Sequence, residues 1–118
     1  MITNLFQHEQ QSETFRAREL IFQEGQPGEV MYVIQAGEVE LFRQGRWVET
    51  VGPGGILAEL ALVDPTAHCF TAQAKTDCQL VPINQTRFKV QVHHYPYFAL
   101  QVMQVMAQRL RRMREIGD

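Results

Sequence analysis

Short apolar runs separated by glycine- and proline-containing turns fill the first two thirds of the chain, and they constrain its fold more than any other feature. Arg43-Gln44-Gly45 lies between two such runs and is a hairpin signal, while Pro82 indicates an edge strand or a bulge. Runs this short and this often interrupted favour an antiparallel sandwich or barrel. The expected strand-forming segments are 14–23, 30–34, 39–42, 46–51, 69–74 and 79–83.

The last third of the chain changes to a helical period. Asn84 or Thr86 can cap a helix over 85–93, Tyr95-Pro96 interrupts it, and a long amphipathic helix is expected over 97–116. This helix either covers the barrel or pairs with a second copy of itself. The second alternative predicts a homodimer whose contact residues are Phe98, Val102, Val105 and Met113.

The length of 118 residues predicts a single domain, with 1–13 as a polar lead-in, 14–83 as the β-rich part and 84–118 as the C-terminal helices. A hydrophobic content of 45% and a charged content of 20% are typical of a globular protein. No apolar run is long enough to span a bilayer, and the N-terminus lacks the pattern of a signal peptide. We therefore expect a cytoplasmic protein without a membrane partner.

Charge and metal-binding residue types exclude several classes of function. Residues 1–64 carry ten acidic and four basic side chains, which disfavours direct binding to nucleic acid. The arginines near the C-terminus complement the dipole of the long helix, and the alternative is that they bind an acidic partner or nucleic acid. Cys69 and Cys78 form no CxxC pair, and the four histidines lack zinc-ligand spacing, so we expect no metal site, no catalytic residues and no cupin-type enzyme.

The segment 54–63 is the most informative stretch for function. Gly54-Gly55 forms a turn that leads into an apolar run with one carboxylate, Glu59, and Asp64-Pro65 ends the run. A glycine turn that precedes a short helix leaves backbone N–H groups pointing outward, as at many phosphate sites. The alternative is a tight turn with a core-packed helical turn and no ligand.

The order of these segments resembles the cyclic nucleotide-binding domain, as in the catabolite activators and the regulatory subunits of cAMP-dependent protein kinase. The resemblance covers roughly 14–116 and implies an antiparallel β jelly roll with flanking helices. It is carried by the segments 22–29, 31–39, 59–62 (Glu-Leu-Ala-Leu) and 71–77. In this family 59–62 belongs to the phosphate-binding cassette, where glutamate accepts a hydrogen bond from the ribose 2′-hydroxyl and arginine pairs with the cyclic phosphate.

The chain departs from the family pattern at two positions of this cassette. Ala58 stands where the family has glycine, and His68 (or Cys69, with a longer loop) stands where it has arginine. The resemblance implies a ligand site formed by Leu57, Ala58, Glu59, Leu60, Ala61, His68, Cys69 and Phe70. Glu59 binds a ligand hydroxyl or caps local backbone, and Phe70 lines the base side of the site or is a core aromatic. A protonated His68 could partly replace the arginine.

The function expected from the sequence is that of a stand-alone regulatory sensor of a small molecule that signals through its C-terminal helix. Binding of cAMP and cGMP is expected to be weak or lost, another small ligand is left open, and no other cofactor is expected. One alternative is a ligand-free dimerisation module. Another is the sensor part of a larger transcription regulator or channel, although no DNA-binding segment follows within the 118 residues.

Overall fold

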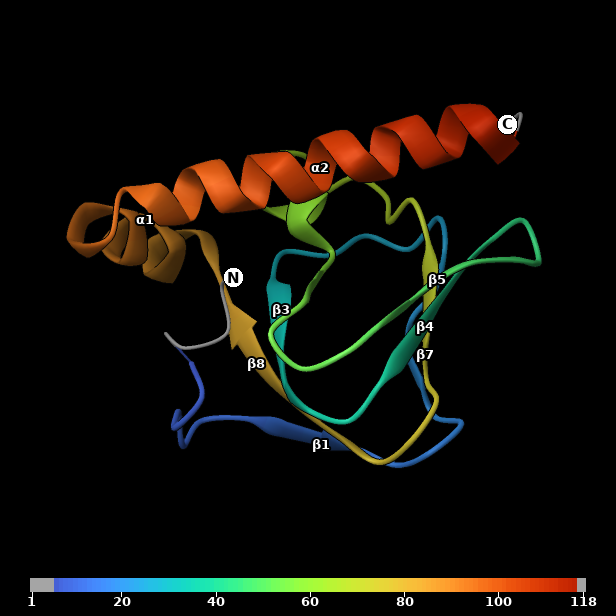
Figure 1. Ribbon diagram of the computed structural model, residues 1–118, viewed down its shortest axis with the longest axis horizontal. Coiled ribbons are helices and arrows are strands. Elements are labelled where there is room, and N and C mark those ends of the chain that lie inside the picture. The colour runs from blue at the N-terminus through green and yellow to red at the C-terminus, as the bar shows by residue number, and fades with distance from the viewer. Residues whose placement is uncertain (1–5, 117–118) are drawn as a thin grey trace.

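The computed structural model describes residues 6–116, which form two four-stranded antiparallel sheets and two α-helices (Figure 1). The strand order is β1-β8-β3-β6 in one sheet and β2-β7-β4-β5 in the other. The elements in chain order are β1 (Glu13–Phe15), β2 (Leu20–Phe22), β3 (Met31–Ala36), β4 (Val39–Arg43), β5 (Arg46–Val51), β6 (Ile56–Leu57), the 3-10 helix η2 (Glu59–Leu62), β7 (Thr71–Ala74), β8 (Cys78–Ile83), α1 (Gln85–His94) and α2 (Tyr97–Ile116).

The turns between strands follow the glycine signals. Gln44 and Gly45 both have positive φ, 53° and 79°, as expected at the tip of a tight β4–β5 hairpin. Gly37 has a φ of 91°, and a Cβ atom there would lie 2.2 Å from the carbonyl oxygen of Asp77. Only glycine therefore allows the β3–β4 turn to approach the β7–β8 turn.

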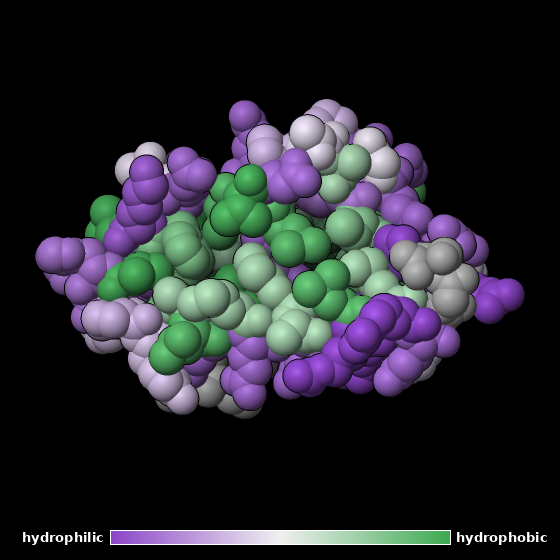
Figure 2. Space-filling model, turned by 90° about the horizontal axis from the view of Figure 1, so that it is seen from above, coloured by the Kyte–Doolittle hydropathy of each residue, from purple (hydrophilic) through white to green (hydrophobic). Residues whose placement is uncertain are grey.

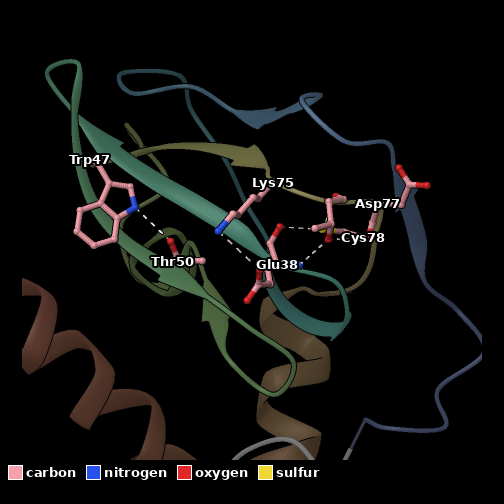
Figure 3. A network of polar contacts seen from close by, with 7 residues as sticks. Glu38, Trp47, Thr50, Lys75, Asp77 and Cys78 are labelled. Carbon is pink, nitrogen blue, oxygen red and sulfur yellow. Dashed lines mark hydrogen bonds and ion pairs between the residues drawn. The ribbon is translucent and has the colours of Figure 1, made fainter.

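Polar contacts join these two turns (Figure 3). The Glu38 carbonyl accepts hydrogen bonds from the Lys75 amide and the Cys78 thiol, and the Thr76 hydroxyl accepts one from the Glu38 amide. The Trp47 indole on β5 donates to Thr50 on the same strand. The bonds of Glu38 satisfy backbone groups at the end of the sandwich away from the helices, whereas the bond of Trp47 joins two side chains.

The expected strand at 14–23 is two strands in different sheets. Arg18, with a φ of 73°, lies in the bend that separates β1 from β2. Pro82 lies on a strand with neighbours on both sides, but β1 pairs only with residues 78–80, so β8 has β3 alone beside it at Pro82. The missing N–H of Pro82 therefore lies where the strand is locally an edge.

The β1-β8-β3-β6 sheet separates two hydrophobic clusters. Ile34 of β3 and Leu80 of β8 point into the sandwich between the sheets, whereas the neighbouring Val33 and Val81 point toward the helices. This alternation is the period of two that a strand buried on both faces requires.

The long helix α2 lies across the helical side of this sheet and over η2 (Figure 1). Phe98 and Val102 are each 1% exposed and pack in the cluster with Met31 and Ile83. The prediction that they contact a second copy is therefore wrong, because they face the core of their own chain. Val105 and Met113, the other two predicted contact residues, are half-buried against the two clusters.

The two helices otherwise agree with the sequence. The side chain of Asn84 accepts a hydrogen bond from the Arg87 amide and caps α1. None of the helices within 6–116 combines the length and apolarity needed to cross a membrane.

The described part of the lead-in is attached to the domain and contains no helix. Phe6 is buried against Phe98, with ring centroids 5.9 Å apart. The amide of Gln35 donates to the carbonyls of Phe6, Gln7 and Glu9. The remainder of the predicted lead-in, residues 1–5, lies outside the described residues.

Candidate functional site

The glycine turn positions the start of the cassette. Gly54 has a φ of 88°, and its amide bonds to the Ile34 carbonyl; a Cβ atom at Gly55 would lie 2.2 Å from Cγ1 of Val51. Ala58 then adopts the left-handed conformation (φ 59°, ψ 31°) and its carbonyl accepts from the Ala61 amide. The expected short helix is therefore a single 3-10 turn, and the residue before it has a backbone conformation that is strained for an L-amino acid.

The cassette surrounds a small cavity of about 20 Å³, room for about one water molecule. Seven of the eight predicted ligand residues line it; Leu57 does not, because it is fully buried on β6 and packs in the sandwich core. The lining comprises Phe22, Leu41, Ala58, Glu59, Leu60, Ala61, Ala67, His68, Cys69, Phe70 and Arg109. Phe70 also belongs to the sandwich core, which is one of its two expected placements, and its position on the base side of a ligand stays a prediction.

Arg109 brings a cation from α2 into this cavity. Its Nη1 lies 2.6 Å from Oε1 of Glu59, and its Nε lies 3.1 Å from Oε1 of Glu49 on β5. The side chains of Arg109 and Glu59 are 5% and 3% exposed. A charge-assisted bond this short and this buried fixes α2 to the cassette. Arg109 therefore has a role at the cassette beyond complementing the helix dipole.

The surroundings of His68 disfavour its charged form. Its ring stacks on Phe22 with centroids 4.1 Å apart, and it packs so closely under Gly28 that a Cβ atom there would lie 2.3 Å from Nε2. Burial lowers the pKa of His68 below its usual 6.5. Without a ligand the imidazole is therefore uncharged at neutral pH, and its substitution for the arginine stays a prediction.

Cys69 lies beside a second cation that the cassette does not itself contain. Nη1 of Arg43 on β4 donates to the Cys69 carbonyl at 3.2 Å. Burial raises the pKa of the half-buried Cys69 thiol, and the charge of Arg43 opposes that rise in part. The thiol is therefore protonated at neutral pH, and its chemistry is that of a small cavity-lining group.

The sequence prediction missed Arg43 and Arg109 because it searched for an arginine within the cassette. The cation beside Glu59 comes instead from α2, outside the cassette. The available signal was the position of Arg109 in the helical period, on the same face as Phe98 and Val102. Among residues 6–116, no group of three or more His, Cys, Asp or Glu side chains is arranged to hold a metal ion.

Comparison with known proteins places the chain in one family. The model of the cyclic nucleotide-binding domain family matches residues 12–95. A cAMP-dependent protein kinase regulatory subunit from Eremothecium gossypii is 36% identical over 69 residues, which are 58% of this chain and 15% of that protein.

Solved structures agree with this assignment. The catabolite activator protein of Thermus thermophilus superposes with a TM-score of 0.77 and 27% identity over 87% of this chain and 51% of that one. The N-terminal domain of a transcriptional regulator from Streptomyces coelicolor gives a TM-score of 0.63 and 28% identity over 91% of this chain and 78% of that one. The chain thus spans about half of the activator and a small part of the kinase subunit.

The chain belongs to the cyclic nucleotide-binding domain family. Its two sheets and C-terminal helices have the jelly-roll-like arrangement of the catabolite activator, as the resemblance implied. The domain is of the regulatory sensor type.

Proposed function

We propose that this domain is a regulatory sensor in which the contents of the cassette cavity control the position of α2, and that it binds cAMP and cGMP weakly or not at all. The observation that carries the proposal is the buried ion pair between Glu59 and Arg109. The pair links Glu59 of the cassette directly to Arg109 of α2, so a group that displaces one of them also affects the other.

Weak binding of cyclic nucleotides is supported by the charges around the cavity. A cyclic phosphate carries one negative charge and is best held by an arginine fork. The cassette offers a neutral His68 instead, and Glu59 is already paired with Arg109. Losing such a charge-assisted contact costs about 1.5–3 kcal/mol, which is about ten- to a hundredfold in affinity.

The size of the cavity supports the same proposal. A volume of about 20 Å³ accommodates no nucleotide, so α2 and the cassette have to separate before one enters. The free energy of that separation reduces the apparent affinity of any ligand that needs the open state. Such a ligand also has to replace the bond that Arg109 makes with Glu59.

The unequal attachment of α2 supports signalling through this helix. Its first half is anchored by Phe98 and Val102 in an apolar core. Its second half is attached through Arg109, the half-buried Met113 and a hydrogen bond from Arg112 to the Val48 carbonyl. A ligand group that binds Glu59 in place of Arg109 would therefore release the second half and leave the first half in place.

A melting scan with 1 mM cAMP or cGMP at pH 7.5 and pH 6 tests the proposal. The Tm of the wild-type protein should change little or not at all at pH 7.5. A ligand that binds well, present at a hundred times its dissociation constant, would add about 2.7 kcal/mol to the free energy of unfolding and raise the Tm clearly. The His68→Arg variant should gain a shift, and the neutral His68→Gln variant is the matched control. A clear rise in Tm for the wild type with micromolar cAMP at pH 7.5 would contradict the proposal.

Dimerisation is the second function that an observation favours. Leu100, Met103 and Leu110 on α2 are each more than half exposed, which is uncommon for large apolar residues grouped on one helix. A homodimer through these residues replaces the dimer predicted through Phe98 and Val102. Sedimentation at several concentrations tests it, and a monomer at all concentrations would contradict it.

A further inference from the structure

Three arginines in the last turns of α2, Arg111, Arg112 and Arg114, are exposed, unlike the buried Arg109. Seen from above α2, the apolar residues form a band with hydrophilic residues on both sides (Figure 2). The helix dipole accounts for the charge of these arginines but not for what their guanidinium groups bind. Guanidinium groups match the geometry of phosphate and carboxylate groups, so an anion is their natural partner.

A groove lies between β5 and the last turns of α2. Residues 47–49 of β5 line one side, and Gln108, Arg111, Arg112 and Glu115 of α2 line the other. These α2 residues follow one another at steps of three, one and three residues, which places them on one side of the helix. The volume of this β5–α2 groove is about 540 Å³, within the range of small-molecule sites. Within 6–116, no residue lines both this groove and the cassette cavity.

The indole of Trp47 gives the groove a flat apolar surface. Its Nε1 donates to the hydroxyl of Thr50 at 3.2 Å, which holds the ring along β5 (Figure 3). Trp47 is nevertheless 56% exposed, so much of the ring surface is accessible. An indole that is both held in place and accessible suits stacking with another planar ring.

The charges in the groove favour an anion. Glu49 is already compensated by Arg109, whose Nε lies 3.1 Å from its Oε1. Arg112 is held against β5, because its Nη1 donates to a main-chain carbonyl of that strand at 2.9 Å. Arg111 and Arg112 then outweigh the negative charge of Glu115, so positive charge is in excess.

We propose that the β5–α2 groove binds a small planar aromatic anion, with its ring stacked on Trp47 and its phosphate or carboxylate group paired with Arg111. Arg112 and the amide of Gln108 supply further donors beside the same anionic group. This site is separate from the cassette, and the proposal therefore goes beyond the sensing proposed above.

Nucleic acid suits the groove less well than a small anion. Single strands bind through several stacked bases and a row of phosphate contacts. Among the described residues that line the groove, Trp47 is the one aromatic residue, and Glu115 would repel a second phosphate. One ring and one anionic group are therefore what the groove can hold.

The fluorescence of Trp47 tests the proposal, because it is the only tryptophan of the chain. The 118-residue protein is titrated with 5′-AMP and with 4-hydroxybenzoate, which combine a ring with a phosphate and a carboxylate respectively. At least one of these probes should quench Trp47 to saturation with a dissociation constant of about 1 mM or lower. Adenosine, which lacks the charge, should bind about fivefold more weakly than 5′-AMP.

Matched variants locate the site. Arg111→Gln should weaken binding of the quenching probe about fivefold. Glu115→Gln should strengthen it about threefold, because a negative charge is removed from the groove. Arg114→Gln removes the same charge as Arg111→Gln but does not line the groove, so it should leave binding unchanged. His68→Gln, in the cassette, should also leave it unchanged.

Five results would overturn the proposal. The first is that neither probe quenches to saturation below about 10 mM. The second is equal affinity for adenosine and 5′-AMP, and the third is equal weakening by Arg111→Gln and Arg114→Gln, which would reflect net charge alone. The fourth is loss of binding in His68→Gln, which would place the probe in the cassette. The fifth is that oligothymidylate binds about tenfold more tightly than either probe, which would point to single-stranded nucleic acid. None of these results alters the melting test with cyclic nucleotides.

Discussion

Arg109 on α2 and Glu59 in η2, fifty residues apart in the sequence, form a buried ion pair with 2.6 Å between Nη1 and Oε1. The pair sits at the edge of the cassette cavity and joins it to the long helix. The carboxylate that the family assigns to ligand binding is therefore engaged by the chain itself.

Removing the arginine should destabilise the fold. Arg109→Met leaves Glu59 buried without its cation and should lower the free energy of unfolding by about 3 kcal/mol. Replacing both residues, with Arg109→Met and Glu59→Met together, should recover most of the loss because no buried charge remains at that contact. Urea unfolding of the two single variants and the double variant gives the coupling energy. Additive losses would show that the two residues act independently.

Ala58→Gly should not destabilise the protein, although replacing alanine with glycine usually does. The left-handed conformation of Ala58 costs an L residue about 1–2 kcal/mol, and glycine removes that cost while adding about 0.5–1 kcal/mol of backbone entropy to lose on folding. The net expectation is a change between zero and about 1.5 kcal/mol in favour of the variant. Ala61→Gly, three residues on in η2, is the control and should be destabilising. If Ala58→Gly lowers the free energy of unfolding as much as Ala61→Gly does, then Ala58 is not strained.

His68 should make stability depend on pH. Burial lowers its pKa in the folded protein, so the unfolded chain binds more protons between that lowered pKa and about 6.5. The stability that the neutral imidazole contributes is therefore present above about pH 6.5 and is lost as the pH falls toward the folded pKa. Urea unfolding at pH 7.5 and pH 5 should show a larger loss for the wild type than for His68→Gln. Equal losses would contradict the assignment.

The β-rich part of the fold could be predicted from local signals. The hairpin at Gln44-Gly45, the tight turn at Gly37 and the helix cap at Asn84 each follow from the preferences of the residues in place. The division of 14–23 into β1 and β2 could not, because no glycine or proline marks the bend at Arg18. An arginine with positive φ leaves no compositional trace.

The sequence predicted which segment forms the candidate site but not the arginine that pairs with its carboxylate. Glu59 and His68 were found because they lie in one contiguous segment. Arg109 was assigned only to the helix dipole, since arginine is rarely fully buried and its partner is fifty positions away. The same difficulty explains the choice of Phe98 and Val102 as dimer contacts, because a helix with apolar residues on two faces does not reveal which face covers its own core.

Amide hydrogen exchange along α2 in Glu59→Gln tests most directly whether the cassette controls this helix. Glutamine keeps the shape of the side chain but removes the charge that Arg109 binds. We predict that the amides of residues 107–115 exchange about tenfold faster than in the wild type, as expected for a loss of about 1.4 kcal/mol, while those of 98–105 keep their protection. Unchanged exchange in 107–115, or an equal increase along the whole helix, would contradict the account.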